Sequence, residues 1–481
     1  MKKLVVSILL CATLLLPVIA FVGCSDNGPA ISKTAQTYNI VFTNATVPVS
    51  MASMDIWTSE NETYFWYSRR DTFQDLTALK KKVHLVGNAG KKNMTGLPNA
   101  ELKSMANKIN QIYKVNKNNK FKLYVVDYGL EAAMKFFYGN GIPEANFEVI
   151  LCSDGDGSYN EMREFLNGDN QTADMNATIA EVDNIIKDAK SKRYNFDKGF
   201  TSWHQSFAYA TKDNVKLWLQ RTPANDGGAQ ADGKYSAGRF AGIDVSVASR
   251  MNIARKDLFA MANEMKTLGG TNSIDSFKQA MFGDVLSDMF KGKDGKKPLI
   301  ITGTSFDGET DFTSVKKTGE TSNLETAFNK IKAVYGDEYF FIYKGHPAWP
   351  THEGYDSSVN WKRTAGVTEN DFNNRVAYIE SAFDFEIPAQ IPADMIMLFY
   401  QDEYALNFGG YDSSLFAAAD RVTNLTTNHT VLFFIGALGA SNSTALSNGN
   451  FDFAIGEKTY RPQILTVANY ATYTDKYKEV V

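Results

Sequence analysis

The sequence contains little cysteine and little histidine, with three cysteines and five histidines among 481 residues. So few cysteines exclude a fold that depends on a framework of disulfide bonds, and no cluster of His and Cys demands a metal ion. There is also no excess of charge of one sign, because 50 Lys and Arg face 54 Asp and Glu. Such a balance gives no indication of a nucleic-acid partner. With 44% apolar residues, the chain has an ordinary globular composition, and its domains must be stable through their hydrophobic cores.

The first residues of the chain predict export. Lys2 and Lys3 precede an apolar run over residues 4–22, and Cys24 follows directly after Gly23. A charged start, a short apolar core and a small residue before cleavage are typical of a secretory signal. A retained membrane-spanning helix fits less well, because it needs about 20 apolar residues with a stable flank.

The position of Cys24 resembles the bacterial lipobox, in which the cysteine thiol is acylated and becomes the new N-terminus. We therefore expect residues 1–23 to be removed and Cys24 to carry lipid, such as palmitate, with residues 24–37 as a polar tether. A plain signal peptide with a chance cysteine is the alternative. The prediction is an exported protein that is lipid-anchored to a bacterial membrane, in which Cys152 is a buried and inert thiol.

Apolar runs alternate with helical patterns along the rest of the chain. Strands without polar alternation are buried on both faces and are typical of parallel sheets between helices. Two such series, separated by a connector near residues 270–297, predict an α/β chain with two doubly wound domains. The predicted strands are residues 38–42, 83–86, 121–126, 147–152, 299–302, 339–343, 376–379, 395–399, 431–435 and 464–467. The predicted helices are residues 100–115, 130–137, 175–186, 251–265 and 324–334. Residues 223–242 are predicted to form a surface loop.

Ligands of open parallel sheets bind beyond the carboxyl ends of the strands, and this rule selects a few loops. Asp154 and Asp156 follow the predicted strand at residues 147–152. A carboxylate at this place can take a proton from a sugar hydroxyl within about 3 Å. A solvated turn is the alternative, since Asp and Gly are common turn residues. An EF-hand calcium loop is not supported, because its twelfth position requires Glu and holds Phe165.

The sequence Lys-Gly-His-Pro at residues 344–347 follows another predicted strand. Lys344 and a protonated His346 can together bind a phosphate. A lone histidine is more often structural, but this sequence context favours a function. The small and hydroxyl-bearing loops at residues 302–305 and 411–414 expose N–H groups that can cradle an anion, although neither is a Walker motif.

With these residues the chain resembles the bacterial sialyltransferases of glycosyltransferase family 80. The sequence Gly-Asp-Gly-Ser at residues 155–158 is similar to the family's motif of two acids, Gly and Ser, and residues 344–347 match its Lys-Gly-His-Pro motif. The chain departs from the family pattern where Gly155 replaces the leading acid and where Phe306 or Asp307 stands in place of a Trp. Further similar segments follow the order of the family between about residues 80 and 435, namely residues 203–207, 302–304, 387–391 and 413–415.

The resemblance implies a GT-B fold, in which two Rossmann-like domains with mainly parallel sheets face each other across a cleft. Residues 38–290 would form the acceptor-binding domain and residues 291–481 the CMP-sugar-binding domain. The implied reaction is a metal-independent and inverting transfer of sialic acid from CMP-sialic acid to a galactoside hydroxyl. The implied partners are the CMP-sialic acid donor, a galactose-terminated glycan and, through the lipid, a membrane. No cofactor is implied.

The resemblance also implies roles for single residues. Asp156 would be the general base, and His346 would assist the departing CMP. Asn88 and Asp154 would contact the acceptor. The implied donor-binding residues are Gly303, Thr304, Lys344, Gly345, Pro347, Asp394, Ser413 and Ser414.

Two other functions remain open at this stage. A GT-B transferase could use another CMP-activated acid sugar, such as CMP-Kdo, or a nucleoside-diphosphate sugar. A lipid-anchored solute-binding protein also consists of two α/β domains on a membrane tether, and it would bind one ligand tightly without turnover.

Overall fold

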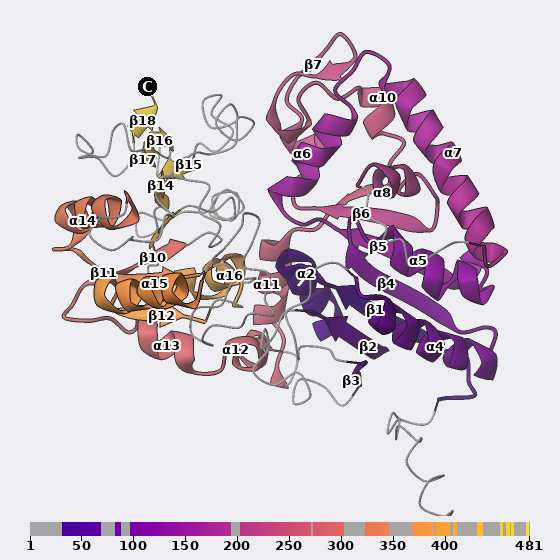
Figure 1. Cartoon of the computed structure of the whole chain (residues 1–481), viewed down its shortest axis with the longest axis horizontal. Coiled ribbons are helices and arrows are strands. Elements are labelled where there is room, and N and C mark those ends of the chain that lie inside the picture. Colours follow the sequence, from indigo (N-terminus) through magenta and orange to yellow (C-terminus); the bar gives the residue numbers. More distant parts are fainter. Residues whose placement is uncertain are drawn as a thin grey trace, which may run out of the picture.

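The computed structural model describes residues 31–68, 82–87, 97–193, 203–270, 273–302, 323–345, 368–388, 391–404, 407–410, 431–435, 453–455, 458–461, 463–465 and 478–480. Within these ranges the chain forms two separate parallel sheets with helices around them (Figure 1). The predicted α/β class with mainly parallel sheets is therefore confirmed.

The first sheet has seven described strands, all parallel. The strand order reverses between β1 and β4, and the crevice at such a reversal is where open sheets bind ligands. In spatial order the strands are β3 (Val83–Leu85), β2 (Glu62–Tyr67), β1 (Thr37–Thr43), β4 (Lys120–Val126), β5 (Phe147–Cys152), β6 (Val215–Leu219) and β9 (Ile253–Arg255).

Helices cover both faces of this sheet, because right-handed crossovers that run in opposite directions from β1 lie on opposite faces. Helix α2 (Thr46–Trp57) packs against β1, β4 and β5, whereas α4 (Asn99–Val115) follows β3 and packs against α5 (Leu130–Phe136). The predicted apolar stripe of α4 is confirmed, since Leu102, Ile109 and Ile112 are fully buried. The other helices of this half are α6 (Asp156–Phe165), α7 (Gln171–Lys190), α8 (Trp203–Tyr209), α9 (Pro223–Asp226), α10 (Val245–Ala248) and α11 (Leu258–Lys266).

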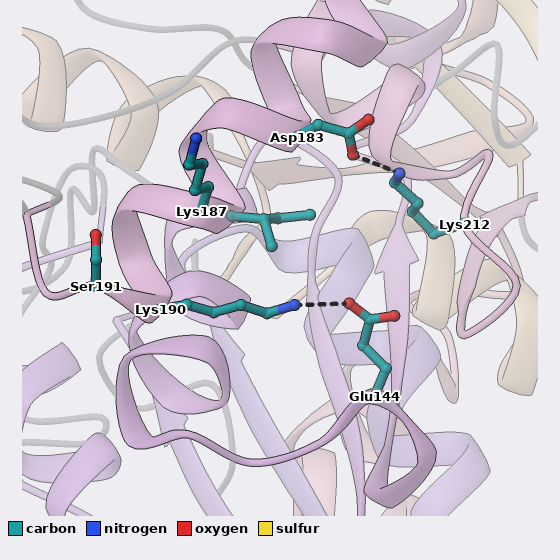
Figure 2. A pocket seen from close by; sticks show the side chains of 7 residues that line it. Glu144, Asp183, Lys187, Lys190, Ser191 and Lys212 are labelled. Carbon is teal, nitrogen blue, oxygen red and sulfur yellow. Dashed lines mark hydrogen bonds and ion pairs between the residues drawn. The ribbon is translucent and has the colours of Figure 1, made fainter.

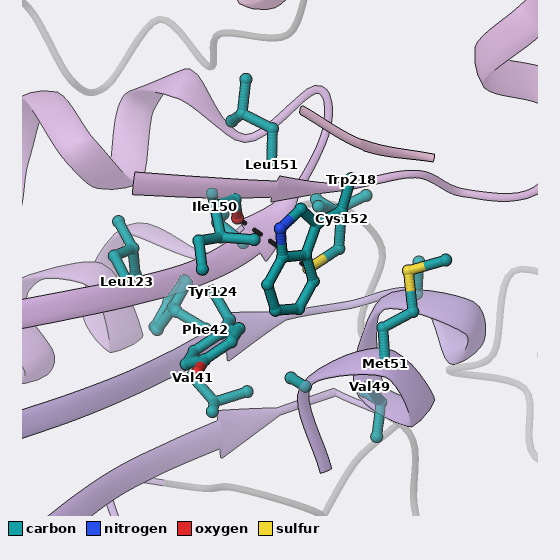
Figure 3. Close-up of a cluster of buried hydrophobic side chains, with 14 of the residues drawn as sticks. Val41, Phe42, Val49, Met51, Leu123, Tyr124, Ile150, Leu151, Cys152 and Trp218 are labelled. Carbon is teal, nitrogen blue, oxygen red and sulfur yellow. Dashed lines mark hydrogen bonds between the residues drawn. The ribbon is translucent and has the colours of Figure 1, made fainter. Parts of the chain in front are cut away.

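The core of the first half is largely aromatic and aliphatic. Val41, Leu123 and Ile150 from adjacent strands are fully buried, as is Met51 from α2 (Figure 3). Phe42 stacks on Trp66 with ring centroids 4.3 Å apart. Cys152 is buried in the same cluster, as predicted, and burial raises the pKa of its thiol.

The second sheet has six described strands, again all parallel, and its order reverses between β10 and β13. In spatial order the strands are β12 (Phe385–Ile387), β11 (Tyr339–Lys344), β10 (Lys297–Thr302), β13 (Asn407–Gly410), β14 (Val431–Ile435) and β17 (Gln463–Leu465). Around it lie α14 (Asn323–Tyr335), α15 (Glu369–Ala382) and α16 (Ala393–Tyr404). A small antiparallel sheet combines β15 (Phe453–Ile455), β16 (Lys458–Arg461) and β18 (Lys478–Val480).

Aromatic side chains join the two halves. Helices α12 (Ile274–Phe282) and α13 (Val285–Phe290) lie between the last strand of the first sheet and the first strand of the second. Phe277 of α12 meets Trp57 of α2 at 5.0 Å and Phe399 of α16 at 5.2 Å between ring centroids. Buried residues of both halves therefore belong to one continuous hydrophobic cluster.

Four predictions of local structure are wrong. Residues 395–399 and 376–379, predicted as strands, lie in α16 and α15. Residues 395–400 are buried, so their apolar run carries no helical periodicity, and a short run of this kind does not distinguish a strand from a helix. The predicted helix at residues 251–265 begins only after Asp257, whose Oδ1 accepts from the Ala260 N–H, and β9 precedes it.

The predicted loop at residues 223–242 contains regular structure. It includes α9, a short 3₁₀ turn at Gly238–Phe240, and the antiparallel pair β7 (Gln230–Ala231) and β8 (Lys234–Tyr235). A hairpin of such short strands offers too few alternating residues for a sequence pattern to reveal it.

Candidate active site

Polar side chains collect at the carboxyl edge of the first sheet. Asn44 follows β1, Asp127 follows β4, and Ser153 and Asp154 follow β5. Asn44, Asp127 and Ser153 are buried, while Asp154 is half-buried. Because the strand order reverses between β1 and β4, Asn44 and Asp127 flank the point where a ligand crevice is expected.

The loop after β5 turns sharply into α6. Gly155 has φ 73° and ψ −143°, a backbone conformation open in practice only to glycine. This conformation gives a physical reason for glycine at position 155. The Asp154 N–H donates to Oγ of the buried Ser158 at 2.9 Å, which closes the turn.

Asp156 is the first residue of α6. The partial positive charge of a helix N-terminus stabilises a carboxylate at such a position. The position of the Asp156 side chain lies outside what the structure describes. The structure therefore places Asp154 and Asp156 on one short loop at the carboxyl edge and leaves their contacts with a substrate as a prediction.

Asp127 lies beside this loop and was not selected from the sequence. Its carboxyl group is fully buried, and its Oδ1 accepts a hydrogen bond from Nε1 of Trp203 at 3.0 Å. Burial raises the pKa of Asp127 to about 8, and the charge of Asp154 adds to this, while Ser158 and Trp203 act in the opposite direction. Asp127 follows the predicted strand 121–126 directly, so the rule that selected residues 153–158 could also have found it.

The carboxyl edge of the second sheet holds Lys344 at the end of β11. Lys344 pairs in register with Thr302 on one side and Ile387 on the other. Only 2% of its surface is exposed to solvent. Its Nζ donates to the carbonyl oxygen of Gly345. A buried ammonium group at the end of a parallel strand suits the binding of an anionic ligand.

Most other predicted site residues lie outside the described residues. Asp394 is the second residue of α16, and its side chain is not among the described ones. The residues that fall outside entirely are Cys24, Asn88, Gly303, Thr304, His346, Pro347, Ser413 and Ser414.

A cavity of about 560 Å³ lies at the opposite edge of the first sheet (Figure 2). It is lined by Glu144, which precedes β5, by Lys212, which precedes β6, and by residues of α7, so it lies at the amino ends of the strands. Nζ of Lys190 lies 3.5 Å from a Glu144 carboxylate oxygen, and Nζ of Lys212 lies 2.5 Å from one of Asp183. These exposed ion pairs mark a solvated surface hollow rather than the predicted site.

A second charged cluster connects α2 with the sheet. Oδ2 of Asp55 accepts from Lys122 at 2.9 Å and from the Tyr124 hydroxyl, and Oδ1 accepts from Lys256 at 2.5 Å. Burial alone would raise the pKa of Asp55, but the two lysines outweigh burial and lower it. The fully satisfied carboxylate fixes α2 to β4 and to the segment after β9, which is a structural role.

The described residues contain no group of three or more His, Cys, Asp or Glu side chains that could hold a metal ion. None of the described helices is both long and apolar enough to cross a membrane.

The fold is similar to solved structures of bacterial sialyltransferases. An α/β-galactoside α-2,3-sialyltransferase from Photobacterium phosphoreum matches with a TM-score of 0.56 and 12% identity, over 91% of this chain and 100% of that one. The sialyltransferase of Photobacterium damselae, solved as residues 113–497 that correspond to its GT-B domain, also gives a TM-score of 0.56 at 12% identity. This match covers 90% of this chain and 100% of that one. A 2,6-sialyltransferase of Photobacterium sp. JT-ISH-224, in a ternary complex with CMP and lactose, gives the same values over 87% and 75%.

These matches confirm the predicted GT-B fold, and the resemblance to bacterial sialyltransferases holds at the level of the fold. No family model matches the sequence. No curated protein matches it either.

Proposed function

We propose that this protein is a glycosyltransferase that moves sialic acid from CMP-sialic acid to a hydroxyl group of a galactoside. The observation that carries the proposal is the fold match with three sialyltransferases over 87–91% of the chain, one of them a complex with CMP and lactose. Two positions along the chain also support the proposal, because ligands of open sheets bind beyond the carboxyl ends of the strands. Asp154 and Asp156 follow a strand of the first sheet, and Lys344 ends a strand of the second.

On the acceptor side, Asp156 acts as the general base. It removes the proton from the acceptor hydroxyl as the oxygen attacks the anomeric carbon of the donor, which inverts that centre. The start of α6 favours the ionised form of the carboxylate that this role requires. Asp154 and Asn88 bind the acceptor sugar.

On the donor side, the transition state has oxocarbenium character, and negative charge builds on the phosphate of the departing CMP. His346 donates a proton or a hydrogen bond to this phosphate, and Lys344, Ser413 and Ser414 add fixed donors. The loop with Gly303 and Thr304, together with Gly345 and Pro347, shapes the donor pocket, and Asp394 binds the cytidine part. No step in this sequence requires a metal ion.

The decisive experiment is to incubate the full-length protein in detergent with CMP-sialic acid and lactose and to follow the release of CMP with and without a chelator. We expect release that depends on lactose and is unchanged by the chelator. Release that the chelator abolishes would contradict the metal-independent mechanism. A panel with CMP-Kdo and nucleoside-diphosphate sugars tests other donors, and tight binding of one ligand without turnover would indicate a solute-binding protein.

We also propose that Cys24 carries the lipid that holds the protein on a membrane. The charged start, the apolar run and the polar switch after Cys24 support this reading. Replacing Cys24 by Ser should move the protein from the membrane fraction to the soluble fraction. If the Cys24→Ser protein stays with the membrane, an uncleaved N-terminal helix is the better explanation.

A further inference from the structure

Asp127 is a fully buried acid at the carboxyl edge of the first sheet, and the mechanism above does not use it. Its backbone N–H donates to the Cys152 carbonyl at 3.0 Å, which fixes Asp127 beside the end of β5. Its Oδ1 accepts from Trp203, but its Oδ2 has no hydrogen-bond partner among the residues that the structure describes. A buried polar atom without a partner costs about 1–3 kcal/mol, so its presence needs a reason.

The side chains around Asp127 connect the segments at the reversal of the strand order. The ring of Trp203 meets that of Tyr128 edge to face at 4.7 Å between centroids, and the Tyr128 hydroxyl donates to Oδ1 of Asn44 at 3.1 Å. Through these contacts Asp127 is linked, by way of α8, to the residue that follows β1. The group lies at the reversal of the strand order.

On its other side Asp127 faces the loop that starts α6. The Ser158 hydroxyl and the Asp154 N–H lie close enough to Asp127 to influence its titration. At the far end of α6, Phe165 stacks on His204 of α8 at 4.6 Å between ring centroids. Near its start, the Tyr159 hydroxyl donates to the Arg221 carbonyl at 3.1 Å. Asp127, beside Ser158 and Asp154, therefore lies at the end of α6 that carries Asp156.

We propose that Asp127 is a positioning residue for the transfer reaction. It holds Trp203 and the turn at residues 154–158 together and thereby fixes the start of α6, where Asp156 is the first residue. This inference rests on the proposed function. Asp127 acts in its neutral form at neutral pH, because burial raises its pKa to about 8. The described groups that face it are Asp154, Ser158 of α6, Trp203 of α8 and the buried thiol of Cys152 at the end of β5. The charge of Asp154 favours the neutral form of Asp127.

The test compares three variants of the full-length protein. Asp127→Asn keeps an acceptor for Trp203 and places an amide where the neutral acid has its hydroxyl. Asp127→Ala removes both. Asn119→Ala is the matched control, because Asn119 is equally buried at the opposite end of β4, where its Nδ2 donates to the Ile112 carbonyl at 3.0 Å.

We expect Asp127→Ala to lower kcat by about 10- to 100-fold with little change in KM, since a misplaced catalytic group has an effect of this size. Asp127→Asn should keep most of the kcat and should lack the decline above about pH 8 that we expect of the wild type. Asn119→Ala should leave kcat unchanged. The proposal is overturned if Asp127→Ala keeps the wild-type kcat, or if Asp127→Asn loses as much as Asp127→Ala.

Hydrogen exchange supplies a measurement that does not need turnover. The amides of residues 154–158 should exchange faster in Asp127→Ala than in the wild type, and at the wild-type rate in Asn119→Ala. A wild type that releases no CMP from any donor refutes the proposed function, whereas unchanged exchange in Asp127→Ala refutes the role of Asp127.

Discussion

The polar side chains at the two edges of the first sheet differ in their exposure to solvent and in their hydrogen-bond partners. At the amino edge, Glu144, Asp183, Lys190 and Lys212 line an open cavity and form exposed ion pairs. At the carboxyl edge, polar groups are buried, and Oδ2 of Asp127 and Oγ of Ser153 have no partner within the described part of the chain. Nδ2 of Asn214, at the amino edge, also has no partner among the described residues, so an unsatisfied buried atom does not by itself mark a site. The unsatisfied oxygens of the carboxyl edge differ in their position, because they lie beside the acidic loop and near the reversal of the strand order. The position of buried polar groups, rather than cavity volume, therefore locates the candidate site.

The largest expected difference between the edges concerns catalysis. Asp156→Asn should lower kcat by about 10²–10⁴, the usual contribution of a general base, and His346→Ala should lower it by about 10²–10³. The measurement is CMP release, with thermal unfolding as the check that the fold is intact. Asp183→Asn, at the amino edge, is the control and should retain full activity. If either Asp156→Asn or His346→Ala keeps near-full turnover, the role assigned to that residue is wrong.

The second difference concerns the dependence of stability on pH. Because the pKa of Asp127 is raised to about 8 in the folded state, both states are protonated below about pH 4 and Asp127 has no effect there. Between about pH 4 and 8 the unfolded state has released a proton that the folded state keeps. This lowers the stability as pH rises, by at most about 1.4 kcal/mol per pH unit, and the loss levels off above pH 8.

Asp127→Asn removes this titration. Its free energy of unfolding, measured by urea denaturation, should exceed that of the wild type by an amount that grows from pH 5 to pH 8. The difference between the two proteins isolates Asp127 from the other carboxylates, such as Asp55, whose pKa is lowered. A difference that does not change with pH would show that Asp127 is ionised in the fold.

A smaller effect is expected from the hydroxyl group that holds α6 to the loop after β6. Tyr159 is buried, and its hydroxyl donates to the Arg221 carbonyl and accepts from the Arg221 N–H at 2.8 Å. Tyr159→Phe removes both hydrogen bonds and should lower the free energy of unfolding by about 1–3 kcal/mol. Urea denaturation measures this change, and a value near zero would contradict the importance of the contact.

The smallest effects should come from the amino edge. Lys190→Ala and Lys212→Ala each break one exposed ion pair, which contributes about 0–1 kcal/mol. Both variants should have wild-type kcat and KM in the CMP-release assay. A clear loss of activity in either variant would show that the cavity takes part in the reaction, and the contrast between the edges would no longer hold.

The sequence was sufficient to predict four strands of each parallel sheet, but β2, β6, β9, β12 and β13 were not predicted. The strand at residues 147–152 coincides with β5, because a buried parallel strand is a continuous apolar run bounded by turn residues. The acidic loop after it could be predicted for the same reason. Helix α16 could not be predicted, because residues 395–400 are buried and the usual polar stripe is missing.

The part of the site that the sequence did not reveal depends on contacts between distant segments. Asp127 and Trp203 are 76 residues apart, and their hydrogen bond forms only when α8 packs beside the end of β4. No local pattern distinguishes a buried Asp at a strand end from a solvated turn residue. Only the depth of burial in the folded chain identifies Asp127 as unusual.

The aromatic contacts of Phe277 with Trp57 and Phe399 have a consequence for how the molecule comes apart. Since one apolar cluster spans both sheets, neither half can unfold without exposing rings of the other. Heat or denaturant should therefore unfold the two halves in a single cooperative step. A polypeptide cleaved between β9 and β10 should yield fragments that aggregate in isolation through their exposed apolar surface and reassociate when mixed.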